Sequence, residues 1–337
     1  MKFIPVILVC FVSWRFALPL EAQALHFPTA NHALLEPDGA ARFFVGTPGK
    51  PWTSGSFGCV RSEGHQLHEG IDIKCLQKNK RGEPIDPVMA AADGVVAYVS
   101  RKPWLSNYGN YVVLQHCIDG LEVYSLYAHL SEIHPTVKPG QRVKAGETIG
   151  TMGRTSNTRS GISKDRAHLH FELVLFMNEH FATWQKKTFP HQRNDHGIWN
   201  GRNLVGLDPR LIFLEQSAKG SSFDLAGFVR NRTPLCRVLV RKTGFPWLKR
   251  YALFARRNPL AEKEGVAGYE ITLDYDGVPF DLVPRAGSEI KSKTTYQLLY
   301  VNEPEEKSHP CRHFLVRRNQ HWALTRTAIQ WLDLLTY

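Results

Sequence analysis

Two histidines and a glutamate alternate with apolar residues near the middle of the chain. In a β-strand, successive side chains point to opposite faces of the sheet. His168, His170 and Glu172 would therefore share one face, and the apolar residues between them would face the core. Imidazole and carboxylate groups can bind a metal ion or transfer protons. Because two solvated histidines on a strand face would give the same pattern, this motif needs support from other residues.

The residues around position 70 would complete a metal site. His68 and Asp72 flank a Glu-Gly-Ile stretch at the start of a strand-like run. A catalytic zinc site has three protein ligands and an open position for water, and zinc accepts both imidazole and carboxylate. One histidine of the pair at 168 and 170 would be the third ligand. His129, in another strand-like stretch, is either a further site residue or a histidine that only makes structural hydrogen bonds.

These residues belong to an ordered series of six motifs. The series is HEGID (68–72), AAADGVV (90–96), YGNYVVLQH (108–116), LYAHL (126–130), VKAGETIG (143–150) and HLHFE (168–172). It resembles the lysostaphin-type (LytM-like) zinc metalloendopeptidases, which hydrolyse peptidoglycan. The resemblance covers roughly residues 57–215, with Leu207-Asp208-Pro209 at the place of the closing strand, and it does not extend to residues 221–337.

The resemblance implies a role for each residue that could bind a metal or transfer a proton. His68, Asp72 and His170 would be the ligands of one Zn²⁺ per chain, and His129 and His168 the catalytic histidines beside the bound water. Zinc lowers the pKa of its water towards 7 and polarises a carbonyl, which opens a peptide bond to attack. Glu172 is expected beside the ligands rather than as one of them. Members that act only as wall-binding or regulatory modules have lost ligands, whereas this chain keeps all five residues.

The fold expected for residues 56–216 is mainly β, an antiparallel sheet of the barrel-sandwich hybrid type. Short β-branched runs separated by Gly, Pro, Asn and Asp predict strands at 70–74, 94–100, 110–116, 121–130, 168–176 and 211–214. The turns within 137–150 also resemble the hammerhead of biotinyl and lipoyl carriers, but the lysine-bearing turn of a carrier is missing. Residues 177–206 are predicted to be a long surface loop. This loop and residues 155–166 are the candidate walls of a substrate groove.

The rest of the chain divides into further segments. Residues 1–24 have a basic start, an apolar run and an Ala-Gln-Ala triplet, which predicts a signal peptide cleaved after Ala24 and an exported protein in the periplasm, cell envelope or medium. An uncleaved amphipathic arm or a buried strand is the alternative. Residues 25–55 are a lead-in segment and 217–222 a linker. Residues 223–337 are expected to form a smaller β-rich domain of unknown function with a final helix. The mature chain is predicted to have no transmembrane span.

Composition fits a folded, basic protein. The 337 residues are 43% hydrophobic and 22% charged, and their net charge is +11, which favours anionic partners. Basic residues interleaved with aromatics between 230 and 257 are either a surface for anionic wall polymers or a solvated face. Nucleic acid is not an expected partner of an exported protein.

The cysteine count leaves the disulfide pairing open. After removal of Cys10 with the signal peptide, five cysteines remain. Cys236 could pair with Cys311 and two of the other three with each other, but sequence does not determine connectivity. Three functions therefore stay open: a zinc endopeptidase of peptidoglycan, a catalytically silent wall-binding or regulatory module, and a secreted protease that acts on proteins.

Overall fold

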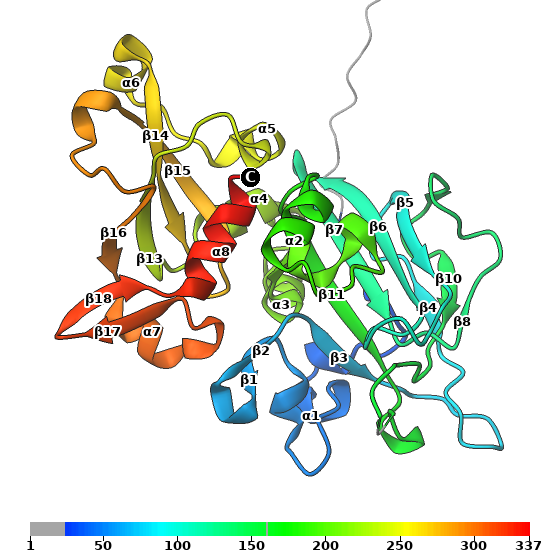
Figure 1. Ribbon diagram of the computed structural model, residues 1–337. Helices are drawn as coiled ribbons and strands as arrows, with labels where there is room; N and C mark the ends of the chain where they lie inside the picture. Colours follow the sequence, from blue (N-terminus) through cyan, green and yellow to red (C-terminus); the bar gives the residue numbers. More distant parts are fainter. Residues whose placement is uncertain (1–23, 160) are drawn as a thin grey trace, which may run out of the picture.

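The computed structural model describes residues 24–159 and 161–337. The predicted signal peptide, with Cys10, therefore lies outside the described residues except for Ala24. The described chain is mainly β, as expected, and its sheets are antiparallel (Figure 1). None of the helices in this part of the chain has the length and apolar character needed to cross a bilayer.

A seven-stranded sheet dominates the N-terminal two thirds. Its order is β12-β11-β7-β6-β5-β9, with β3 also paired to β11. The bounds are β3 Ile71–Lys74, β5 Gly94–Ser100, β6 Tyr111–Ile118, β7 Leu121–Ala128, β9 Arg142–Val143, β11 His168–Phe176 and β12 Leu204–Leu207. Asp119 and Gly120 both adopt positive φ, 52° and 73°, between β6 and β7. Such a pair matches the twist of a tight hairpin, which explains why this strand boundary is readable in the sequence.

Smaller elements surround this sheet. A three-stranded sheet has the order β4-β10-β8, and a separate hairpin joins β1 to β2. Their bounds are β1 Gly58–Arg61, β2 Gln66–His68, β4 Pro87–Met89, β8 Glu132–Ile133 and β10 Thr148–Thr151. The lead-in segment contains the short helix α1, Ala40–Phe43, and buries Phe43 and Phe44. Val45 N donates to Asp72 O at 3.0 Å, so this segment supports strand β3.

The predictions of a strand at 211–214 and of a loop at 177–206 are wrong. Residues 211–214 are not a strand but lie in helix α3, Pro209–Lys219. Asp208 caps this helix by accepting hydrogen bonds from Arg210 N and Leu211 N, and Pro209 occupies the first turn, where no N–H is needed. Residues 217–219 of the expected linker thus continue α3, and 220–222 form a 3-10 turn.

The predicted loop 177–206 contains the helix α2, Phe181–Thr188, two 3-10 turns and the start of β12. Tertiary contacts hold α2 in place: Trp184 is buried, and its Nε1 donates to Asp333 Oδ2 at 3.1 Å. Asn178 Nδ2 donates to Leu334 O at 2.8 Å. These partners lie about 150 residues away in sequence, and eight residues are too few to show a helical period.

The C-terminal part, residues 223–337, is β-rich and ends in a helix, as expected. Its sheet has the order β15-β14-β13-β16, followed by the hairpin β17–β18. The strands are β13 Cys236–Val240, β14 Val266–Leu273, β15 Pro279–Ala286, β16 Tyr296–Val301, β17 Leu315–Arg318 and β18 His321–Leu324. The helices are α4 Leu225–Arg230, α5 Pro246–Arg250, α6 Pro259–Glu264, α7 Glu303–Ser308 and α8 Arg326–Leu335.

Helix α8 lies between the C-terminal sheet and the N-terminal elements (Figure 1). The turn between β14 and β15 packs directly on it, because Trp331 Nε1 donates to Gly277 O at 2.9 Å. Gly277 has φ 94°, and a Cβ there would come within 2.7 Å of the Trp331 ring, so only glycine fits. One continuous hydrophobic core connects residues of both parts of the chain.

A disulfide also joins the two parts. Cys59 in β1 is bonded to Cys311, and the other described cysteines, Cys75, Cys117 and Cys236, are free. The pairing of Cys236 with Cys311 is therefore wrong. Cys236 is buried in the central part of its sheet, whereas Cys311 lies in a 3-10 turn that contacts the β1–β2 hairpin.

Candidate metal centre

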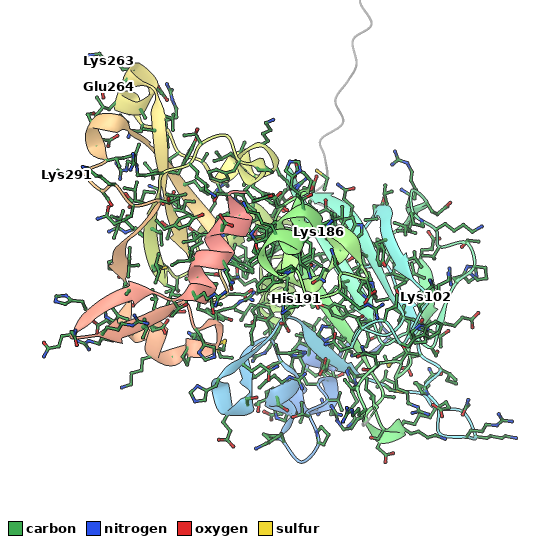
Figure 2. All side chains as sticks on the ribbon, viewed as in Figure 1. Lys102, Lys186, His191, Lys263, Glu264 and Lys291 are labelled. Carbon is green, nitrogen blue, oxygen red and sulfur yellow. A yellow bond between two sulfur atoms is a disulfide. The ribbon has the colours of Figure 1, made fainter. Side chains whose placement is uncertain are left out.

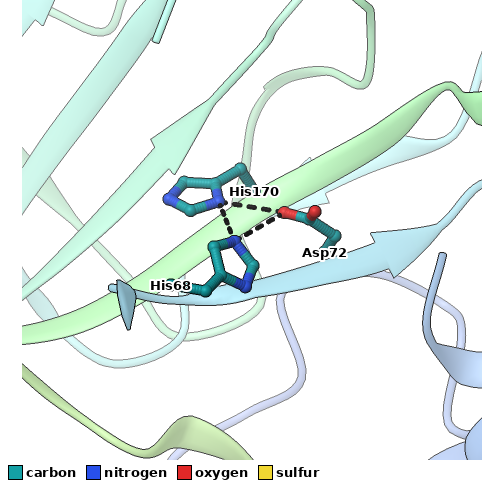
Figure 3. Close-up of side chains that lie close together, drawn as sticks. All are labelled: His68, Asp72 and His170. Atoms are coloured by element: carbon teal, nitrogen blue, oxygen red, sulfur yellow. Dashed lines mark hydrogen bonds and ion pairs between the residues drawn. The ribbon is translucent and has the colours of Figure 1, made fainter. Parts of the chain in front are cut away.

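Sheet register and one hairpin bring the three predicted ligands together (Figure 3). In the antiparallel pair β3–β11, Asp72 is the direct partner of His170. His68 is the last residue of β2. Asp72 Oδ1 lies 3.0 Å from His170 Nδ1 and 3.2 Å from His68 Nε2, and these two nitrogens are 3.2 Å apart. All three side chains are buried, and all nine residues of β11 are buried, which excludes two solvated histidines.

Hydrogen bonds orient both imidazoles towards the cluster. His68 Nδ1 lies 2.7 Å from Ser56 O, an acceptor only, so Nδ1 carries the proton. His170 Nε2 donates in the same way to Glu172 Oε1 at 2.8 Å. The lone pairs of His68 Nε2 and His170 Nδ1 then face each other and the Asp72 carboxylate. Three such acceptors repel one another unless a proton or a cation lies among them.

The spacing of the three atoms suits a tetrahedral metal. Nitrogen and oxygen ligands lie about 2.0–2.1 Å from zinc, so two ligands of a tetrahedron are about 3.3 Å apart. The observed separations of 3.0–3.2 Å are close to this value. The donor set of two imidazoles and one carboxylate is also one that zinc accepts, and it leaves a fourth position open.

The pKa shifts within the cluster also indicate a site that suits a cation. Burial by itself would raise the pKa of Asp72, but the neighbouring His68, His168 and His170 hold that pKa well below its usual value. Burial also disfavours a charged His170, yet hydrogen bonds to Asp72 and Glu172 raise the pKa of His170 to about 10. A proton thus takes the place of a cation, and metal binding must release it.

The two predicted catalytic histidines lie against this cluster. The ring centroids of His129 and His168 are 4.9 Å apart, and His168 Nε2 lies 3.5 Å from Asp72 Oδ1. Each ring donates its Nδ1 proton to a backbone carbonyl, Thr155 O for His129 at 2.9 Å and Arg166 O for His168 at 2.6 Å. Burial lowers the pKa of both rings, well below the usual value for His129. Neutral imidazoles with free Nε2 atoms can accept a proton.

The five residues line one open groove of about 950 Å³. Both predicted wall segments contribute to it, residues 155–166 through Ser156, Thr158 and Arg166 and residues 177–206 through His196, Asn200 and Arg202. The lead-in segment adds Thr47 and Pro48. Arg166 Nε donates to Gly46 O at 2.9 Å and so ties one wall to that segment.

Sequence reasoning missed one residue at the cluster. Arg61 Nη2 donates to Asp72 Oδ2 at 2.6 Å and lies 3.0 Å from His68 Nε2. The contact with Arg61 fixes Oδ2 of Asp72 and leaves Oδ1 directed at His68 and His170. Arg61 precedes the hairpin turn and belongs to none of the six motifs, so only the folded hairpin brings it to the site.

Four other histidines lie outside the metal cluster, and one of them, His196, lines the same groove. His116 is buried between Asp93 O and Ser125 Oγ, at 2.9 and 2.6 Å, which is a structural position. His196 is buried on the groove wall and contacts Tyr98 Oη at 3.0 Å. His65 contributes its carbonyl to a contact with His313, and His191 is exposed.

The fold and the cluster can now be compared with known proteins. Residues 66–181 match Peptidase family M23. The chain therefore contains an M23 peptidase domain. This M23 domain includes His68, Asp72, His129, His168 and His170, whereas Arg61 and the C-terminal part lie outside the matched residues.

Curated relatives match about a quarter to a third of this chain. Peptidoglycan DD-endopeptidase ShyA of Vibrio cholerae is 39% identical over 89 residues, which are 26% of this chain and 17% of ShyA. Cell division protein DipM of Caulobacter vibrioides is 36% identical over 118 residues, 35% of this chain and 16% of DipM. Murein hydrolase activator NlpD of Salmonella dublin is 38% identical over 106 residues, 32% of this chain and 22% of NlpD. The chain thus spans about a fifth of the length of these relatives.

Among solved structures, the catalytic domain of lysostaphin from Staphylococcus simulans is 23% identical, with a TM-score of 0.28 over 48% of this chain and 87% of that one. A zinc-containing peptidase from Vibrio cholerae is 32% identical, with a TM-score of 0.24 over 32% of this chain and 26% of that one.

A contact behind His170 leads to a first prediction. Glu172 Oε1 accepts hydrogen bonds from both His170 Nε2 and Tyr108 Oη, the latter at 2.7 Å. A Glu172→Gln variant keeps an acceptor but loses the charge that makes His170 a better ligand, so we expect zinc affinity to fall roughly 10- to 100-fold. Competition with a chromophoric chelator measures this change. An unaltered affinity would mean that Glu172 only fills space beside the site.

Proposed function

We propose that this protein is an exported zinc endopeptidase that hydrolyses peptide bonds in bacterial peptidoglycan stems or cross-links. The observation that carries the proposal is the convergence of His68 Nε2, Asp72 Oδ1 and His170 Nδ1 within 3.2 Å at the floor of an open groove. Both neighbouring histidines are buried there, and burial lowers the pKa of each. The similarity to a peptidoglycan DD-endopeptidase supports the choice of substrate.

The residues of the chain divide the chemistry among them. A zinc ion bound by His68, Asp72 and His170 would supply a water of lowered pKa and would polarise the scissile carbonyl. His129 and His168 present free Nε2 atoms because each Nδ1 proton is held by a backbone carbonyl. One Nε2 would accept the proton of the attacking water and, once protonated, could pass it to the leaving amine. The other histidine would stabilise the oxyanion only when its own Nε2 carries a proton. The groove walls hold the peptide over these atoms.

Digestion of purified sacculi tests the proposed function. The zinc-loaded protein should release fragments with new amino termini from the peptide stems, readable by mass spectrometry, and a chelator should stop the release. Intact sacculi after treatment with zinc-loaded protein would contradict the proposal. Cleavage of unstructured proteins under the same conditions would instead identify a secreted protease with the same catalytic residues.

A regulatory module is the second candidate, because one similar protein is named a murein hydrolase activator. The complete set of five residues in one groove argues for the enzyme. Under the regulatory alternative, the protein alone would leave sacculi intact but would speed their digestion by an added murein hydrolase.

The basic segment 230–257 has fewer unpaired charges than its sequence indicates. Most of its cations contact acidic side chains: Arg232–Asp274, Arg237–Glu270, Lys242–Asp333, Arg250–Glu122, Arg256–Asp281 and Arg257–Glu262. These ion pairs favour a structural, solvated face over a surface for anionic wall polymers. Lys263 and Glu264, which lie outside this segment, are exposed at the tip of the C-terminal part (Figure 2).

The groove wall 155–166 provides a second prediction. Glu83 accepts hydrogen bonds from Arg154 Nε at 2.7 Å and Nη2 at 3.0 Å, and Lys164 Nζ lies 3.2 Å away. The Arg154 bond lowers the pKa of Glu83 to about 2, so these pairs stay ionised at any assay pH near neutral. A Glu83→Gln variant loses the charge that holds Arg154 and Lys164, so we expect KM to rise about two- to fivefold while kcat stays unchanged.

Steady-state kinetics on a soluble stem peptide measure this effect. The matched control is Glu36→Gln, which breaks the exposed Arg42–Glu36 pair in the lead-in segment. Equal kinetics for both variants would show that the Glu83 contacts do not position the groove wall.

A further inference from the structure

The three residues of the metal cluster are supported very unequally. Asp72 and His170 are paired across β3 and β11 inside the seven-stranded sheet, so the ladder fixes their distance. His68 ends the β1–β2 hairpin, which forms a two-stranded sheet of its own in the described chain. An isolated two-stranded hairpin is only marginally stable in water. The position of His68 therefore depends on what holds this hairpin.

The C-terminal part holds the hairpin at both of its strands. In the hairpin, Cys59 pairs with Leu67 and Gly58 with His68. The disulfide between Cys59 and Cys311 holds β1 at the residue next to Gly58, the partner of His68. At the start of β2, His313 Nε2 donates to His65 O at 2.9 Å.

A third contact lies at Gly58 itself. This glycine has φ 100°, and a Cβ there would lie 3.0 Å from Tyr275 Oη. The Tyr275 ring thus packs against the backbone of Gly58, the residue that pairs with His68. Tyr275 in turn stacks on His309, with ring centroids 4.3 Å apart, two residues before Cys311. Covalent, hydrogen-bond and packing contacts from residues 275–313 therefore converge on one short hairpin.

We propose that the C-terminal part positions the third metal ligand. The Cys59–Cys311 disulfide and the His313 contact pre-organise His68, so that the cluster binds its metal without first ordering the hairpin. Pre-organisation of ligands by their supporting contacts raises affinity because less conformational freedom is lost on binding. The inference rests on the proposed zinc site. It gives residues 223–337 the role of positioning a ligand of that site, although they supply no metal ligand themselves.

Zinc affinity of the full chain tests the inference directly. Metal-free wild-type protein and a Cys59→Ser/Cys311→Ser variant are titrated with Zn²⁺ against a chromophoric chelator, at a temperature where circular dichroism shows both to be folded. Both cysteines are replaced together so that no single thiol remains to bind zinc. We expect the affinity of the double variant to fall at least about tenfold, as for other contacts that orient metal ligands. Cys117→Ser, which removes an exposed free thiol, is the matched control and should not change the affinity.

A rescue experiment separates positioning from general damage. Saturating Zn²⁺ should return the kcat of the double variant towards the wild-type value, since the lost contact affects binding of the metal and not the chemistry. If the double variant does not fold, His313→Ala, which keeps the disulfide, should still lower zinc affinity severalfold. Equal zinc affinity of the folded variant and the wild type would overturn the inference while the proposed function stands. A wild-type protein that binds no zinc would overturn the proposed function itself.

Discussion

A His170→Ala variant is expected to lose both zinc binding and peptide hydrolysis. His170 Nδ1 is one of three lone pairs that converge within 3.2 Å, and two remaining ligands cannot enclose a cation in a buried site. A bound metal contributes several kcal/mol of transition-state stabilisation, and each 1.36 kcal/mol is a factor of ten in rate. The rate of stem-peptide cleavage should therefore fall at least about a thousandfold.

The measurement combines metal content with hydrolysis. Purified protein is analysed for bound zinc by mass spectrometry, and sacculus digestion is followed by release of peptide fragments. His321→Ala, an exposed histidine on β18, is the control that should keep both properties. A His170→Ala protein that still holds one zinc per chain would show that the metal binds elsewhere.

Much of the β fold could be predicted because its signals are local. Strands β5 and β11 have the predicted bounds, and the tight turns at Asp119-Gly120 and Asp276-Gly277 separate neighbouring strands. Alternation and turn residues act over a few positions, which is the range that a single sequence reports well.

The incorrect predictions involve contacts between distant residues or competing local signals. In α3, the Asp208 cap and Pro209 are helix-start signals, but the apolar run 211–214 by itself favours a strand. Helix α2 depends on Trp184 reaching Asp333, and the disulfide joins cysteines 252 positions apart. No periodicity encodes such contacts.

In the candidate site, too, local motifs identify some residues, and only the folded chain identifies others. Five residues could be named from motifs, and the structure places them around one groove. The groups that orient them could not be named, because they are a backbone carbonyl at Ser56, a guanidinium at Arg61 and the C-terminal contacts of the hairpin. Backbone carbonyls carry no residue signature, and a lone arginine is common on any surface. Motifs therefore indicate which side chains gather at the groove, while the folded chain shows what holds them there.

His129→Ala and His168→Ala should produce the opposite pattern to His170→Ala. Neither histidine belongs to the set of three converging ligand atoms, so zinc affinity should stay within a few-fold of the wild type. Each offers a neutral Nε2 beside the cluster, and a positioned proton-transfer group contributes roughly 10²- to 10⁴-fold. We therefore expect kcat to fall by that factor in each single variant, with little change in KM.

A His129→Ala/His168→Ala double variant tests whether the two histidines act independently or as one unit. If one histidine accepts the proton of water and the other acts on the oxyanion or the leaving amine, both steps serve the same transition state. Removing the second histidine should then cost much less than removing the first, because groups that act as a unit are strongly non-additive. Full multiplication of the two losses would instead mean that the histidines act independently. His134→Ala, an exposed histidine, controls for loss of an imidazole. A parallel loss of zinc in either single variant would identify that histidine as a ligand and would revise the assignment of His68, Asp72 and His170.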